Sequence, residues 1–294
     1  MDWFGGLQAG QVLELSYQFT FDGAVEPNIA TMTLNGADVC SGTGSSTGST
    51  GSSSTTTSTA STSPSSSSSS STGNPVTTST SSTSCSAERF DYGRVLELSN
   101  LFYEAQRSGE LPTDNRIDWR GDSSLDDQGQ NGEDLSGGYH DAGDYVKFGL
   151  PMASAMTVLA YGGIMYPEAY NDAGQFSYLQ SSVKWGTDYF IKAHTGPNEF
   201  YCQVGNGDID HAYPGRPETM TVDRPAYKLD ASNPGSDCAG ETAASLASAS
   251  LLFSDTDPSY SDLLLDHAKE LFTFADTYRG IYSNSIPDAA KFYK

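Results

Sequence analysis

Apolar residues recur three and four positions apart through the chain after residue 90, a spacing typical of amphipathic helices. In residues 91–109, Val95, Leu98, Leu101 and Phe102 fall on one face, and Gly109 ends the pattern. Proline, glycine or polar residues bound the other segments with this spacing, which are residues 151–167, 176–194, 240–254 and 258–280. The pattern therefore predicts about five helices.

Before residue 41 the pattern changes to an alternation of apolar and polar positions, which is typical of strands. It covers residues 12–21 and residues 29–36, where a turn follows. Forty residues with two or three strands are too few for a stable β-sandwich. We therefore expect residues 1–40 to be the C-terminal part of a larger β domain.

Residues 41–84 are almost entirely serine, threonine and glycine. Such a segment cannot bury enough apolar surface to offset its ordering entropy, so we predict a disordered linker. Dense Ser and Thr with scattered proline is typical of an O-glycosylated stalk. We therefore expect a secreted, extracellular protein, although no signal peptide is visible in the first residues. Residues 85–294 form the helical domain in this division.

The chain carries 37 acidic and 15 basic residues, for a net charge of -22. This charge argues against nucleic acid and anionic membrane surfaces as partners. No apolar run approaches the length of a membrane span, so no membrane contact is expected. A neutral polymer or a small molecule fits the composition as a partner.

The four cysteines show no C-x-x-C pair, so the sequence does not support a zinc site of the usual spacing. Cys202 and Cys238 lie near long loops in the second half, and we predict a disulfide between them. Cys40 and Cys85 flank the linker. They could pair with each other, or Cys40 could have a partner upstream.

Long loops separate the first two predicted helices and the third from the fourth, and loops of this length are usually functional. The first loop contains Asp141 and Asp144, with only Ala142 and Gly143 between them. Two close carboxylates suit acid–base catalysis, because like charges and burial push their pKa values apart. In glycoside hydrolysis one such carboxylate activates water. Solvated surface aspartates in a glycine-rich loop are the alternative.

The second loop contains His211 and Tyr213, a ring on which a sugar face could stack. A lone loop histidine is also common as a plain surface residue. Trp119 and Trp185 are predicted to be packing residues.

Metal binding has little support in these loops. An EF-hand pattern starting at Asp127 fails, because Gly129 and Gly138 occupy ligand positions. A group of His140, Asp141, Asp144 and His211 could in principle bind a transition metal, but the spacing does not favour it. We predict no metal site.

Several segments in order carry a family signature, among them "WRGDSSL", "DLSGGYHDAGDYVKFGLPMA", "QVGNGDIDH" and "RPAYKLDASNPGSDCAGETAASLA". From about Arg89 onward the chain resembles the family 9 glycoside hydrolases, cellulases with an all-α (α/α)6 barrel. The resemblance implies inverting endo-hydrolysis of β-1,4-glucan such as cellulose. It implies that Asp144 is the general base, that Asp141 helps to hold the attacking water and that His211 contacts sugar. No cofactor is implied for the chemistry, and a monomer is expected.

Residues 1–40 resemble the end of a family 2 carbohydrate-binding module, a β-sandwich. Trp3 matches one of the tryptophans that stack on cellulose in such modules. An ordinary buried aromatic anchor is the alternative for Trp3.

The chain also departs from the family pattern. Pro214 stands where many relatives have a tryptophan, and about five of the barrel's twelve helices are readable. The family's general acid, a glutamate, has no counterpart, and a structural calcium would belong to the barrel segment beyond Lys294. We therefore expect a partial sequence whose uncovered apolar helix faces make it unstable or prone to aggregate alone. A non-catalytic glucan-binding protein is the alternative function. A structural glycoprotein is a third reading, which the Asp141–Asp144 loop disfavours.

Overall fold

The computed structural model describes residues 31–34, 37–41 and 90–294, in two units that meet in sequence at Phe90. In the first unit, β1 (Thr31–Leu34) and β2 (Ala37–Ser41) form an antiparallel pair with an irregularity between Met32 and Thr33. The strand predicted within residues 29–36 is confirmed. Trp3, the strand predicted over residues 12–21, Cys85 and nearly all of the linker lie outside the described residues.

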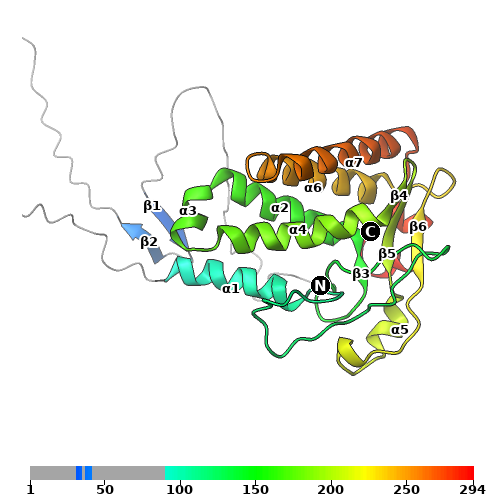
Figure 1. Ribbon diagram of the computed structural model, residues 1–294, viewed down its shortest axis with the longest axis horizontal. Helices are drawn as coiled ribbons and strands as arrows, with labels where there is room; N and C mark the ends of the chain where they lie inside the picture. Colours follow the sequence, from blue (N-terminus) through cyan, green and yellow to red (C-terminus); the bar gives the residue numbers. More distant parts are fainter. Residues whose placement is uncertain (1–30, 35–36, 42–89) are drawn as a thin grey trace, which may run out of the picture. The chain divides into compact units, whose positions relative to one another are not determined.

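Five long helices of the second unit match the five predicted ones (Figure 1). They are α1 (Tyr92–Ala105), α2 (Gly149–Met165), α4 (Phe176–Ala193), α6 (Ser236–Phe253) and α7 (Pro258–Thr277). The short helical turns are α3 (Pro167–Asp172), α5 (Gly207–His211), α8 (Tyr282–Ser285), η1 (Pro217–Thr219) and η2 (Ala289–Lys291). No helix among the described residues is both long and apolar enough to cross a bilayer.

Local sequence signals set where the long helices begin. The Asp91 carboxylate accepts the Arg94 N–H over 2.8 Å at the start of α1. Asp257 does the same for the Tyr260 N–H over 3.1 Å at the start of α7, where Pro258 fills the first turn. The cap of α6 is a glycine without a side-chain bond, and α6 starts at Ser236 rather than at the predicted Gly240.

The core of this unit lies where α6 packs against α7 and α2, and where α4 packs against α2 (Figure 1). Ala239, Ala243 and Ala249 of α6 are buried there. Their small side chains let the neighbouring helices approach closely, which leaves few voids. Larger buried side chains such as Phe190 and Leu271 fill the remaining space.

Helix α1 buries polar side chains and exposes its apolar face. Val95, Leu98 and Phe102 are 52%, 49% and 60% exposed. On the opposite side the Asn100 amide donates to Gln175 Oε1 over 3.2 Å, so that buried amide is satisfied. These three apolar side chains of α1 are therefore exposed to solvent.

A four-stranded antiparallel sheet lies beside the helices and was not predicted. Its central strand β5 (Glu199–Val204) pairs with β3 (Lys147–Phe148) and β4 (His194–Gly196) along one edge and with β6 (Ala226–Leu229) along the other. The sheet adds to the predicted helical architecture, and it was missed because strands of two to six residues are too short to show a period.

A disulfide between Cys202 and Cys238 joins β5 to the first turn of α6, which confirms the predicted pair.

Candidate active site

A tight turn holds Asp141 and Asp144 side by side, just before β3. The Asp144 N–H donates to the Asp141 carbonyl over 3.0 Å, and the Asp141 N–H donates to the Val146 carbonyl over 2.9 Å. Ala142, inside the turn, has φ 37°, a left-handed conformation that non-glycine residues rarely adopt. Such strain persists only where surrounding structure enforces it, and it concentrates at functional sites.

Both carboxylate oxygens of Asp144 have a partner. Oδ1 accepts the Val146 N–H over 3.0 Å, and Oδ2 lies 2.5 Å from Nε2 of His211. The Asp144 side chain is 11% exposed, so it reaches solvent at one edge. Charge-assisted bonds of this kind fix the direction in which a carboxylate points.

Asp141 is more deeply buried than a surface aspartate would be. Burial raises its pKa, and the neighbouring charge of Asp144 raises it further. The Tyr293 hydroxyl donates to Asp141 Oδ2 over 2.6 Å and opposes this increase. The reading of the pair as two solvated surface carboxylates is therefore wrong for Asp141.

His211 comes from a separate element, the short helix α5. The Asn206 side chain caps this helix by accepting the Ile209 N–H over 3.1 Å, and it also donates to Asp288 Oδ1 over 3.0 Å. The ring of Phe292 packs edge-on against the His211 ring, with centroids 5.0 Å apart. These contacts hold the imidazole beside Asp144, although 44% of the side chain is exposed.

An open pocket of about 330 Å³ lies against Asp144. Trp119, 60% exposed, lines it, so the prediction that Trp119 is a packing residue is wrong. Trp185 does pack against the core and donates its indole N–H to the Gly138 carbonyl over 2.9 Å. The other residues of the wall include Phe102, Tyr145, Arg120, Arg216 and Glu218.

Glu218 is the glutamate in this pocket wall. Burial alone would raise its pKa, but the Gly121 N–H and the guanidinium groups of Arg120 and Arg216 lower the pKa to about 2. The Arg120 and Arg216 Nε atoms lie 2.9 and 3.1 Å from the Glu218 carboxylate. Glu218 is therefore ionised at neutral pH and is unsuited to donate a proton.

Tyr213 is half-buried and contacts two residues of the pocket wall. Its ring meets the Tyr145 ring edge-on at 6.3 Å, and its hydroxyl donates to the Arg216 carbonyl over 3.2 Å. The structure brings together Asp141, Asp144 and His211. Tyr213 contacts Tyr145 and Arg216 of the pocket wall instead, and Trp3 lies outside the described residues.

His140 does not act as a metal ligand in this arrangement. It is buried, which lowers its pKa to about 3, so the ring is neutral. Nδ1 donates to the Tyr145 carbonyl at 3.0 Å, and Nε2 accepts from Ser123 Oγ at 3.2 Å. Within the described part of the chain, no group of three or more His, Cys, Asp or Glu side chains is arranged to hold a metal ion.

Tyr293 and Phe292 were not found by sequence reasoning. Each contacts a predicted site residue, Tyr293 at Asp141 and Phe292 at His211. Both residues are far along the sequence from the residues they contact. Their aromatic character is the one sequence feature that could have indicated a role at the site.

The family model described as Glycosyl hydrolase family 9 matches residues 92–294. The chain belongs to glycosyl hydrolase family 9. Endoglucanase A of Bacillus pumilus is 53% identical over 204 residues, which cover 69% of this chain and 31% of that protein. Endoglucanase 5 of Arabidopsis thaliana is 55% identical over 210 residues, which cover 71% of this chain and 34% of that protein. The family 9 chain thus spans about a third of the length of these curated relatives.

Solved structures agree with this assignment. The endoglucanase of the termite Nasutitermes takasagoensis at pH 2.5 matches with a TM-score of 0.69 and 61% identity, over 69% of this chain and 47% of its own. A C. cellulolyticum cellulase in complex with cellobiose matches with a TM-score of 0.64 and 34% identity, over 69% of this chain and 54% of its own. The described helices therefore belong to a fold of the (α/α)6-barrel type.

Proposed function

We propose that this family 9 chain carries the water-activating half of an endoglucanase that hydrolyses internal β-1,4 bonds of cellulose with inversion. The observation that carries the proposal is the placement of Asp144 at the edge of an open pocket, with both oxygens oriented and Asp141 beside it. The endoglucanase relatives and the cellobiose complex of the C. cellulolyticum cellulase support the substrate class.

In the proposed mechanism, a water molecule donates hydrogen bonds to the carboxylates of Asp144 and Asp141. Asp144 takes a proton from this water as the water attacks the anomeric carbon, and Asp141 orients it. The leaving glucan oxygen receives a proton from a separate acid, as inverting hydrolysis requires. Glu218 is not that acid, because it is ionised. No cofactor takes part.

Sugar contacts are proposed for His211, which contacts Asp144, and for Tyr213, which contacts Tyr145 and Arg216 of the pocket wall. His211 donates to or accepts from a hydroxyl of the glucan, and the Tyr213 ring stacks on a sugar face. The exposed ring of Trp119 joins this set, because it lines the same pocket as Asp144. The substrate is a neutral glucan, which matches a site without a large excess of either charge.

The domain arrangement and location are proposed from the sequence. Residues 1–40 are the end of a family 2 carbohydrate-binding module in which Trp3 stacks on cellulose, residues 41–84 are a Ser/Thr-rich linker, and residues 85–294 are catalytic. The protein is secreted and acts as a monomer. The Cys202–Cys238 disulfide supports an oxidising compartment.

The test is Asp144→Asn in the protein encoded by the native transcript. Removing a general base lowers kcat by roughly 10²–10⁴-fold, whereas binding of cello-oligosaccharide should persist. Proton NMR of the parent enzyme's first product should show the α-anomer, because inversion converts a β bond to an α product. Asp172→Asn, on an exposed turn, is the matched control and should keep parental activity.

Two outcomes would contradict the proposal. Parental turnover in Asp144→Asn would remove Asp144 as the base. A parent protein that binds cello-oligosaccharide without releasing any reducing ends would support the non-catalytic glucan-binding alternative.

A further inference from the structure

The two peptide groups on either side of Tyr145 are hydrogen-bonded by side chains from distant parts of the chain. The Tyr145 N–H donates to Asp210 Oδ1 over 2.8 Å. The Tyr145 carbonyl accepts from Arg224 Nη2 over 2.9 Å and from His140 Nδ1 at 3.0 Å. Arg224 Nη1 then donates to Asp210 Oδ2 over 3.2 Å and closes the arrangement.

One of these peptide groups is hydrogen-bonded to the Asp144 carboxylate. The peptide that offers its carbonyl to Arg224 is the one whose N–H, on Val146, donates to Asp144 Oδ1. A charged donor at the carbonyl polarises the peptide and strengthens its N–H as a donor. The other carboxylate oxygen, Oδ2, is held by His211, the neighbour of Asp210 on α5. Both oxygens of Asp144 are therefore positioned through Arg224 and Asp210.

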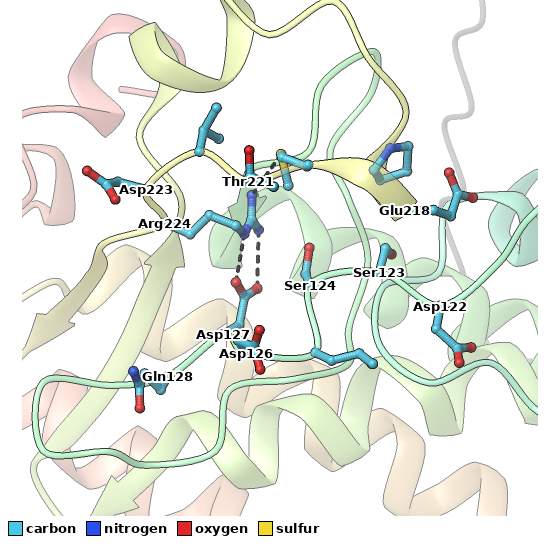
Figure 2. A pocket seen from close by; sticks show the side chains of 14 residues that line it. Asp122, Ser123, Ser124, Asp126, Asp127, Gln128, Glu218, Thr221, Asp223 and Arg224 are labelled. Carbon is cyan, nitrogen blue, oxygen red and sulfur yellow. Dashed lines mark hydrogen bonds and ion pairs between the residues drawn. The ribbon is translucent and has the colours of Figure 1, made fainter.

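Arg224 is itself fixed by a buried carboxylate. Its Nε and Nη2 atoms donate to the two oxygens of Asp127 over 2.7 and 3.2 Å, and Figure 2 shows both bonds as dashed lines. Lys147, fully buried, adds a second cation 2.6 Å from Asp127. Arg224 is 10% exposed and Asp210 2%, so the cluster contains two cations and two anions largely away from water.

We propose that Arg224 and Asp210 are positioning residues for the water-activating carboxylate, with Arg224 aiming Asp144 through the 145–146 peptide. The inference rests on the proposed role of Asp144. Neither residue lines the pocket against Asp144, so their loss should change the rate of the chemical step and leave substrate binding in place.

Arg224 also lines a second open pocket, of about 580 Å³ (Figure 2). This pocket gives a small cation a route to the space that the guanidinium occupies. In Arg224→Ala, kcat should fall by about 10²-fold with KM unchanged, because misplaced catalytic groups cost about this much. Added guanidinium ion at millimolar concentration should restore part of kcat, whereas sodium ion at the same ionic strength should not.

Arg116→Ala is the matched control in the same full-length protein. Within the described part of the chain, the Arg116 guanidinium bonds to the buried Glu104 of α1 and not to residues 141–146. It should lower the melting temperature without a guanidinium-dependent change in kcat. Loss of activity in Arg224→Ala that follows the folded fraction, with no rescue beyond that of the control, would overturn the inference.

Asp210→Asn decides the question if Arg224→Ala does not fold. The amide keeps an oxygen for the Tyr145 N–H but loses the ion pair with Arg224. We expect kcat to fall by about tenfold at constant KM, and parental kcat would overturn the inference. Failure of the proposed function is separate, because it would appear as turnover in Asp144→Asn.

Discussion

The hydroxyl of Tyr293 donates a hydrogen bond to Asp141 and opposes the effect of burial on the pKa of that carboxyl. Burial raises the pKa of Asp141, and the 2.6 Å bond from Tyr293 lowers it. Tyr293→Phe removes the donor, so the pKa of Asp141 should rise further. Because the proposed mechanism needs Asp141 ionised, the acid limb of the kcat–pH profile should move to higher pH. Activity measured across the acid range checks this shift.

Tyr166→Phe is a suitable control, since Tyr166 is 63% exposed. Its acid limb should coincide with that of the parent. An acid limb that stays in place in Tyr293→Phe would show that ionisation of Asp141 does not limit the rate.

At this scale, the sequence reveals groups that lie close along the chain. Asp141 and Asp144 were predicted as a pair because only two residues separate them, and the structure places both in one turn. The contact of Asp144 with His211 spans 67 positions, and that of Asp141 with Tyr293 spans 152. Such contacts depend on tertiary packing, and no local pattern encodes them. The exposure of Trp119 was missed for the same reason.

The disulfide between β5 and the start of α6 leads to a prediction about thermal stability, because it links two elements of the fold. It closes a segment with a sequence separation of 36, and constraining such a loop in the unfolded chain is worth about 4 kcal/mol. Cys202→Ala with Cys238→Ala should therefore lower the melting temperature by about 10 °C for a domain of this size. Thermal unfolding followed by circular dichroism measures the difference.

A reducing agent is the matched control for this prediction. It should lower the melting temperature of the parent toward that of the double variant and leave the double variant unchanged. Equal melting temperatures for the oxidised parent and the double variant would contradict a stabilising disulfide.

Elements differ in how well the sequence predicts them. The five long helices were found because their apolar residues repeat over many turns. The sheet was missed because β3 has two residues and β5 finds its partners far away, in β3 and β6. Helix α5, which carries His211, has five residues and lies inside a polar loop. It is too short for a helical repeat of apolar residues to be recognised in the sequence.

At the scale of the whole molecule, two opposing properties decide how copies of this chain interact. Helix α2 exposes Val158, Tyr161 and Met165, which follow one another at helical spacing and are 67%, 56% and 50% exposed. Apolar stripes of this kind favour association. The net charge of -22 opposes it through repulsion between copies.

Salt separates these two contributions. At about 0.1 M ionic strength the Debye length is about 10 Å, so repulsion between copies is largely screened, whereas apolar attraction is not weakened. The 294-residue chain expressed by itself should therefore self-associate more as salt is added. Light scattering after size exclusion measures the mass at each salt concentration.

Val158→Gln with Met165→Gln should shift this 294-residue chain toward monomer at every salt concentration, because the double change interrupts the exposed stripe of α2. Ser154→Gln, at another exposed position of α2, is the matched control and should behave as the parent. A parent that remains monomeric at high salt would show that the uncovered helix faces do not drive association. A double variant that associates as the parent does would show that another surface drives association. The exposed apolar face of α1 would then be the next surface to change.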